Sequence, residues 1–289
     1  MFRYILIPAT GAPTDAPVFA AALEMARRDG GHIKFLHTRP NVDTIVAAMA
    51  ASDLGGGGAG LDDIIRSLET DIAGKETAAQ TAFQEFCERE KVAVGSAVSG
   101  PSPSAEFVVE TGDEATYLAE HGRVADLIVA GRPREGETVA FDVLEVSLLH
   151  TGRPVLIVPA VLPAQRSGTV VIAWKNKPEA ARAVAAAQPL VAAAKKVIIL
   201  AVEEGSGTAE PSCKRLRAAL LWHNPNTSIE RLTQDSRPCA EVVLDAAMAA
   251  EADVLVMGGY GHSRVREVIF GGVTEHVLAG AAVPVFMVH

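Results

Sequence analysis

The 289-residue sequence lacks several features that mark common classes of protein. It has only three cysteines, widely separated, with no CxxC or Cys/His spacing that could wrap a metal ion. We therefore expect the thiols of Cys87, Cys213 and Cys239 to be reduced and packed in the protein interior.

Basic charge is also scarce, because 26 Lys and Arg stand against 35 Asp and Glu, for a formal net charge of −9. Outside a local basic patch, such a protein is repelled by nucleic acid and by anionic membrane surfaces, so neither is expected as a partner. No apolar run is long enough to span a bilayer, and the first one stops at Pro8, too early for a signal peptide. We expect a cytoplasmic location.

Catalytic motifs are absent as well. There is no Rossmann GxGxxG fingerprint and no Walker GKS/T motif. A hydrolase needs an activated nucleophile or a metal-held water. The segments His262-Ser263 and Thr274-Glu275-His276 offer suitable residue types, but no spacing ties them into a triad. The sequence therefore predicts no catalytic residues.

What the sequence does contain is an alternation of apolar β-type runs with amphipathic helical segments. Apolar runs without alternation are typical of strands buried on both faces of a parallel sheet, which need crossover helices. In the first half, strands are predicted at 4–8, 32–37, 92–98, 125–130 and 153–159, and helices at 16–28, 61–89, 113–121 and 141–149. In the second half, strands are predicted at 169–173, 196–202, 229–232, 253–258 and 283–288, and helices at 178–194, 213–222, 240–250 and after Gly272. Asp15 is the predicted N-cap of the first helix.

The second half repeats the first. Residues 126–131, DLIVAG, match residues 253–258, DVLVMG, and residues 153–158, RPVLIV, match residues 283–288, VPVFMV. A linker rich in Pro, Ala, Ser and Gly separates the copies. The pattern predicts an α/β protein of two tandem, doubly wound, five-stranded parallel sheets. The predicted domains are 1–160 and 161–289.

The extra length of the first half lies between its second and third strands. The segment Thr38–Gly60 ends in four glycines, 55–58, and is predicted to be a mobile loop. A long surface helix follows at Leu61–Arg89. Because this helix carries more apolar surface than one small sheet requires, it could also support a homodimer.

A segment interrupted by glycines near the C-terminus is the best candidate site. Gly258, Gly259 and Gly261 follow a strand directly, at the edge where parallel sheets bind ligands, and glycine there permits positive φ and close approach of a phosphate. The residues Gly271-Gly272-Val273-Thr274 then open the last helix, whose free amides and positive dipole end suit an anion. On spacing alone, simple tight turns are an equal alternative.

The pattern Gly258-x-x-Gly261, nine residues, then Gly271 followed by Gly272-Val273-Thr274 resembles the C-terminal signature of the universal stress protein family. A weaker likeness covers the chain as a tandem pair of such domains. The resemblance implies a Rossmann-like fold of the adenine nucleotide alpha hydrolase type, with ATP, and Mg²⁺ with it, held by this loop. It also implies that the closing strands of the two domains pair antiparallel, as an internal pseudo-dimer.

By this resemblance, an adenine nucleotide site is expected in the C-terminal domain. Its expected residues are Ala173, Trp174, Lys175, Val202, Met257, Gly258, Gly261, Gly271, Gly272, Val273 and Thr274. The implied function is that of a stress-response sensor or interaction module with no enzyme activity beyond weak ATP hydrolysis. The alternative is a scaffold of the same fold that binds no nucleotide.

Three departures from the family pattern bear on this site. Gly272 replaces a Ser or Thr, which removes a hydroxyl whose hydrogen bond contributes about 0.5–1.5 kcal/mol. The acidic residue expected shortly after the first strand is absent from both halves, which have Ala9-Thr10 and Trp174-Lys175 there. Lys175 could attract a phosphate, stay solvated or block the adenine end. In the first half the loop is Gly131-Arg132-Pro133-Arg134, whose arginines could bind an anion, although a solvated loop is favoured.

Overall fold

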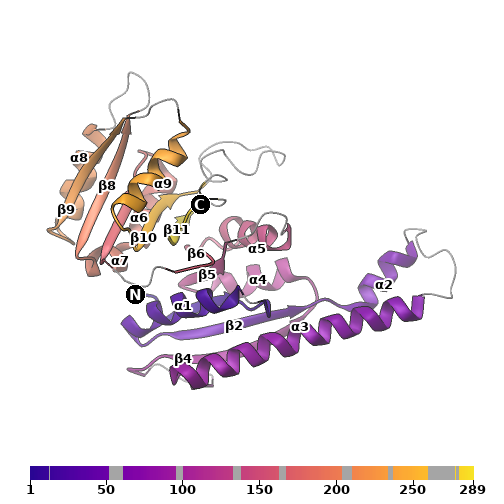
Figure 1. Ribbon diagram of the computed structural model, residues 1–289. Coiled ribbons are helices and arrows are strands. Elements are labelled where there is room, and N and C mark those ends of the chain that lie inside the picture. The colour runs from indigo at the N-terminus through magenta and orange to yellow at the C-terminus, as the bar shows by residue number, and fades with distance from the viewer. Residues whose placement is uncertain are drawn as a thin grey trace. The chain divides into compact units, whose positions relative to one another are not determined.

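The structure is a computed structural model that describes residues 1–12, 14–51, 61–95, 100–132, 138–162, 167–203, 210–233, 237–259, 277 and 280–289. The chain forms two compact units, Phe2–Ala125 and Asp126–His289, and Met1 is grouped with the second. Each unit is described by itself (Figure 1).

The first unit is a parallel sheet covered by helices. Its strands lie in the order β3-β4-β2-β1, and each of these neighbouring pairs is parallel. The central strand β2 pairs with β1 on one side and with β4 on the other. In chain order the elements are β1 (Tyr4–Pro8), α1 (Asp15–Asp29), β2 (His32–Arg39), α2 (Val42–Ala51), α3 (Leu61–Glu90), β3 (Ala93–Val94), β4 (Ser104–Thr111) and α4 (Glu114–Arg123).

Four phenylalanines hold α1 and α3 against β2. Phe19 of α1 lies edge-on to Phe35 of β2, with ring centroids 4.7 Å apart. Phe83 of α3 lies 4.9 Å from Phe35, and Phe86 contacts both Phe19 and Phe35. All four side chains are buried, so these ring contacts add to the free energy of apolar burial.

The second unit is a sheet of order β5-β6-β11-β10-β7-β8-β9. Neighbouring strands are parallel except β6 and β11, which run antiparallel from Val285↔Ile157 to Met287↔Val155. The predicted antiparallel pairing of the two closing strands is therefore confirmed. In chain order the described elements are β5 (Leu127–Gly131), α5 (Thr138–Leu149), β6 (Val155–Val158), β7 (Thr169–Ala173), α6 (Pro178–Ala186), α7 (Gln188–Ala193), β8 (Lys196–Glu203), α8 (Glu210–Leu220), β9 (Thr227–Thr233), α9 (Cys239–Ala249), β10 (Val254–Gly258) and β11 (Val285–Val288).

The internal repeat is visible in the hydrogen bonds of the closing strand pairs. The N–H of Ile128 donates to the carbonyl of Pro154 over 3.0 Å, and the N–H of Leu255 donates to the carbonyl of Pro284 over 2.9 Å. These residues occupy equivalent positions in the aligned segments. Together with the parallel strand pairs, the shared register confirms the predicted α/β fold.

Of the third strand predicted at 92–98, the structure shows the two-residue β3, and residues 96–98 lie outside the described residues. The eight-residue β4, further along the chain, was not predicted. Strand β4 is difficult to predict from the sequence because it contains the polar residues Ser104, Glu106 and Glu110. Glu106 is tolerated half-buried because its carboxylate lies 3.3 Å from the ammonium of Lys34 on the neighbouring strand β2.

Two helical expectations also need correction. The segment Thr38–Gly60, predicted as loop, contains α2, while the four glycines at 55–58 lie outside the described residues. The single helix predicted at 178–194 is two helices, α6 and α7, separated at Ala187. Pro189 accounts for the break, because it has no N–H to donate and its ring disfavours the preceding helical turn.

The compact units divide between Ala125 and Asp126, whereas the sequence repeat predicts a boundary after residue 160. The two differ because β6 pairs with β11, which joins β5, α5 and β6 to the second unit. The boundary after residue 160 stays a prediction. None of the described helices combines the length and the apolarity that a membrane span requires.

Candidate functional site

The structure describes part of the predicted nucleotide site. It places Ala173, Trp174, Lys175, Met257 and Gly258, together with the backbone of Val202 in β8. The other five predicted residues lie outside the described part of the chain: Gly261, Gly271, Gly272, Val273 and Thr274.

The described site residues meet at the carboxyl edge of the second unit's sheet. Ala173 of β7 is the register partner of Met257 in β10 and of Leu200 in β8, and Val202 lies two positions beyond Leu200. The chain leaves β7 toward β8 and leaves β10 toward β11, on opposite sides. The point between β7 and β10 is therefore a topological switch point, where open parallel sheets bind ligands.

Trp174 follows β7 directly and carries a buried donor. Its indole Nε1 has no hydrogen-bond partner within the described part of the chain. Buried indole N–H groups usually find a partner, and a buried donor without one costs about 1–3 kcal/mol. A ligand that offered an acceptor at this position would remove that cost.

Two lysines connect Trp174 to α6. Lys175 and Lys177 are exposed, and the N–H of Lys177 donates to the carbonyl of Lys175 over 2.7 Å, which tightens the turn. Lys177 is the N-cap of α6, and Pro178 begins the helix. Positive side chains thus lie beside the positive end of a helix dipole. Glu179 in the first turn carries the opposite charge and lowers this positive potential.

The glycines after β10 serve packing. Contrary to expectation, neither Gly258 nor Gly259 has a positive φ. A Cβ on Gly258 would lie 2.6 Å from the backbone nitrogen of Ala180 and 2.7 Å from the carbonyl carbon of Glu179, so α6 requires glycine there. The N–H of Gly259 donates to the carbonyl of Val288 over 2.8 Å. A role for Gly258 in phosphate binding stays a prediction.

In the first unit, an acidic side chain does lie beyond β1, although none is expected there. Asp15 lies inside the first turn of α1 rather than at its N-cap, and it is 5% exposed. Its carboxylate accepts hydrogen bonds from the N–H of Thr10 at 3.0 Å, the hydroxyl of Thr10 at 2.8 Å and the N–H of Gly11 at 2.9 Å. Burial raises the pKa of Asp15, and these hydrogen bonds oppose the rise. Asp15 was not predicted as this acidic residue, because the prediction considered only the positions directly after the strand.

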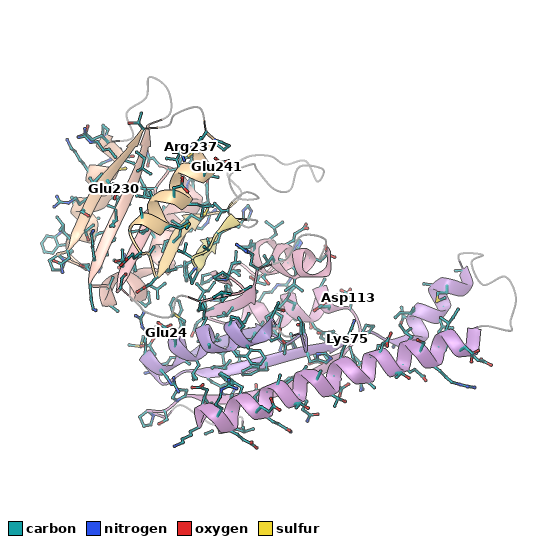
Figure 2. The ribbon with its side chains drawn as sticks, viewed as in Figure 1. Glu24, Lys75, Asp113, Glu230, Arg237 and Glu241 are labelled. Carbon is teal, nitrogen blue, oxygen red and sulfur yellow. The ribbon has the colours of Figure 1, made fainter. Side chains whose placement is uncertain are left out.

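His37 and α3 complete the closure of this end of β1. The Nδ1–H of His37, on β2, donates to the carbonyl of Ala9 over 2.7 Å. Gly11 has a φ of +78°, and a Cβ on it would lie 2.7 Å from the carbonyl oxygen of Lys75, which is labelled on α3 in Figure 2. The chain's own atoms therefore fill the region beyond β1. No local signal in the sequence links α3 to Gly11.

Arg132 is engaged with the protein, which argues against both the anion site and the solvated loop considered from the sequence. Its N–H donates to the carbonyl of Val158 over 2.8 Å. Its guanidinium donates to the carbonyl of Ala281, a buried residue shortly before β11. Arg132 thereby ties the end of β5 to the turn that precedes β11. Arg134 lies outside the described residues.

The cysteines agree with the expectation of packed thiols. None of the three forms a disulfide; Cys87 and Cys213 are buried and Cys239 is half-buried. Burial raises the pKa of the Cys87 thiol to about 11. Within the described ranges, no group of three or more His, Cys, Asp or Glu side chains is arranged to hold a metal ion.

Comparison with protein families agrees with the geometry of the second half. Residues 166–289 match the model of the Universal stress protein family. Residues 166–289 therefore form a domain of this family. No curated protein matches the chain.

Solved structures that match nearly the whole chain include the following two. One is a universal stress protein from Archaeoglobus fulgidus DSM 4304, with 15% identity over 99% of this chain and 96% of its own, and a TM-score of 0.64. The other is a functionally unknown protein from Pseudomonas aeruginosa PAO1, with 17% identity over 99% of this chain and 92% of its own, and a TM-score of 0.56. At these identities the likeness shows a shared fold, and it extends over both halves.

Proposed function

We propose that the second half of this protein binds an adenine nucleotide at the carboxyl ends of β7, β8 and β10, and that the protein acts as a sensor or interaction module in a stress response. The match of residues 166–289 to the Universal stress protein family supports the proposal. The observation that carries it is the buried indole N–H of Trp174. This donor has no partner among the described residues and lies at the switch point of the sheet.

The described residues favour a nucleotide in two respects and oppose it in one. The indole N–H of Trp174 suits a ring nitrogen of a purine, which accepts hydrogen bonds. Lys175 and Lys177 suit phosphate groups, because their ammonium charges attract anions. Against this, α6 occupies the space beside Gly258 and adds the carboxylate of Glu179. We therefore assign Trp174 to the base and the two lysines to the phosphates.

Bound ATP supplies negative charge, with Mg²⁺ accompanying its phosphates, and a phosphoanhydride bond. We assign no residue to cleavage of that bond. The proposed role of the chain's own residues is to hold the nucleotide and to exclude water from the indole.

Tryptophan fluorescence tests the assignment directly. The sequence has two tryptophans, and Trp222 is 90% exposed, so Trp222→Phe leaves Trp174 as the single indole. We expect a saturable change in its emission on titration with ATP. The matched control Trp174→Phe retains Trp222 and should show no such change. In calorimetry, Trp174→Phe should weaken ATP binding by about fivefold through loss of one hydrogen bond, without loss of stability. Wild-type protein that shows neither saturable heat nor a saturable change in emission would refute nucleotide binding.

A scaffold of the same fold that binds no nucleotide is the second candidate. It is favoured by Gly258, whose missing side chain is explained by contact with α6. An extract of the purified, denatured protein distinguishes the two candidates. Adenine nucleotide present in stoichiometric amount rules out the scaffold, whereas its absence together with a flat calorimetric titration supports it.

We also place the protein in the cytoplasm, where the thiols of its three cysteines are kept reduced. Fractionation of cells, followed by detection of the protein with an antibody, tests this placement. Recovery of the protein outside the cytoplasmic fraction would overturn it.

A further inference from the structure

The first half contains a helical hairpin that its sheet does not use. We call α2 together with residues 61–72 of α3 the arm. In the second half the connection from β8 to β9 is made with α8, which has 11 residues. In the first half the connection from β2 to β4 holds both α2 and the 30-residue α3. Figure 1 shows α2 and the beginning of α3 extending beyond the strands of the first unit.

Burial divides α3 into two parts. Its C-terminal part contributes four buried residues to the core, namely Ala79, Phe83, Phe86 and Cys87. From residue 62 to residue 78, no residue is buried. Residues 62–72 of α3 therefore contribute no fully buried side chain to the core of their unit, although they are helical throughout.

The arm nevertheless carries apolar side chains at helical spacing. On α3, Ile64 is 49% exposed, and Ile65, Leu68 and Ile72 are half-buried. The half-buried residues of α2, which contacts α3, include Ile45, Val46 and Met49. Helices in proteins depend on packing of an apolar face, and two isolated helices bury little of theirs. The arm thus leaves apolar surface for a partner to cover.

The charge of the arm selects the kind of partner. Its described charged side chains between residues 42 and 72 are five carboxylates and a single guanidinium, all exposed: Asp43, Asp62, Asp63, Glu69, Asp71 and Arg66. Arg66 lies 4.0 Å from Asp63 in an exposed pair, which contributes little attraction. A second copy would bring the same negative charges to the apolar stripe, and like charges repel. A segment with lysine or arginine beside its apolar residues is attracted.

We propose that the arm is a docking surface for a helix of another protein that presents apolar side chains flanked by lysine or arginine. Contact with Ile64 and Leu68 supplies most of the affinity, because apolar burial dominates association. The carboxylates of the arm supply selectivity and faster association. This docking surface does not depend on nucleotide binding in the second half.

Two labelled peptides test the proposal with the full-length protein. Each is a helix of about four turns with leucine at i, i+3, i+4 and i+7. The remaining positions are lysine in one peptide and glutamate in the other. Fluorescence anisotropy should show saturable binding of the lysine peptide and none of the glutamate peptide. Raising the salt from about 0.05 to about 0.3 M should weaken binding of the lysine peptide several-fold, since salt screens exposed charges.

Matched variants locate the binding surface. Ile64→Ser combined with Leu68→Ser should weaken binding of the lysine peptide by at least about tenfold. Asp62→Asn combined with Asp63→Asn should weaken binding and reduce its salt dependence. The control Trp222→Ser removes a side chain that is 90% exposed outside the arm, and it should change nothing. If the apolar double variant loses helical circular dichroism, the single variant Ile64→Ser replaces it, because that side chain is half-exposed.

Three outcomes would overturn the proposal. Equal binding of the two peptides would remove the charge selection. Equal weakening by Trp222→Ser and by the apolar double variant would show unspecific adhesion. A wild-type dimer in sedimentation that Ile64→Ser dissociates would assign the arm to a second copy of this chain, as the sequence-based expectation of a homodimer requires.

Discussion

The two halves of the molecule finish their first strands differently. Beyond β1, Asp15 folds back onto Thr10 and Gly11, and α3 packs over Gly11. Beyond β7, Trp174 holds a buried indole N–H without a partner in the described ranges, and lysines connect it to α6. The first half thus fills this region with its own atoms, whereas the second half has a buried donor there with no partner among the described residues.

This difference separates what the fold requires from what a site requires. The bonds from Ile128 to Pro154 and from Leu255 to Pro284 are shared, because both copies need them to build the sheet. The position of Trp174 is taken in the first half by Ala9, which has no side-chain donor. The residues that differ between the two copies are therefore the ones that distinguish a strand end closed by the protein itself from one proposed to bind a ligand.

Substitution of Gly258 is expected to have the largest effect. In Gly258→Ala the new Cβ would lie 2.6 Å from the backbone of α6, which is far below a normal contact and would force the helix away from β10. Overpacking of this kind costs about 2–3 kcal/mol of stability. Urea unfolding followed by circular dichroism measures the loss.

The control for this variant is Gly74→Ala, in α3, where a Cβ meets no atom within 4 Å. It should stabilise the protein by about 0.5–1 kcal/mol, because alanine is the better helix former. Unchanged stability in Gly258→Ala would mean that α6 does not need the glycine, and the residue would then be better explained by a ligand.

Removal of the Asp15 side chain should have the next largest effect on stability. Asp15→Ala leaves the two backbone N–H groups of Thr10 and Gly11 without their acceptor, at a cost of about 2 kcal/mol. Asp15→Asn keeps one oxygen acceptor and should lose less. Thermal unfolding of the three proteins gives the comparison, and an equal loss in both variants would show that the charge, rather than the hydrogen bonds, matters.

Asp15 also predicts a pH dependence. Burial raises its pKa in the folded protein above the ordinary value of 3.8, so the folded state holds this proton more tightly than the unfolded state does. The resulting stability is fully present below the unfolded pKa and is lost as the pH rises through the folded pKa. Relative to Asp15→Asn, the wild type should therefore lose stability as the pH rises from about 3.5 to 7. A difference that stays constant over this range would contradict the assignment.

The repeated strands could be predicted from the sequence because their signal is local. The apolar runs at 127–131 and 254–258 are buried on both faces and carry the same pattern. Strand β4 could not be predicted in the same way, because half-burial of Glu106 depends on Lys34, which lies far away in the chain. A charge that a cross-strand partner satisfies looks like a loop residue when the sequence is considered alone.

The candidate site shows the same limit. Trp174 and Gly258 could be placed at one edge of the sheet, since the ends of parallel strands meet there. The contacts of Gly258 could not be predicted, because α6 approaches it from a distant part of the sequence. Asp15 was missed because it lies five residues after Thr10, in the first turn of α1, whereas the acidic residue was expected directly after the strand.

Arg132 sharpens the comparison between the halves. It occupies the position that Gly259 holds in the second copy, and glycine has no side chain for an equivalent contact. Arg132→Gln should lose the bond to Ala281 and cost about 1 kcal/mol, with faster amide exchange in β11. Arg66→Gln, which changes an exposed arginine, is the control and should have almost no effect. Unaltered exchange in β11 would show that the contact is dispensable.

Substitution of the cysteines should have the smallest effect, and this effect should appear in the rate of thiol modification rather than in stability. Cys87 lies on α3, the helix that closes the end of β1, and its thiol is buried with a pKa raised to about 11. Cys239 is half-buried at the start of α9. Because the thiolate is the reactive form and must be accessible, a maleimide reagent should modify Cys239 first and Cys87 only at the rate at which α3 opens. Cys239→Ser should remove the fast phase, and Cys87→Ser should leave it. Rapid modification of Cys87 in the folded protein would mean that α3 separates readily from Gly11. The end of β1 in the first half would then be accessible to a ligand, as is proposed for the end of β7 in the second half.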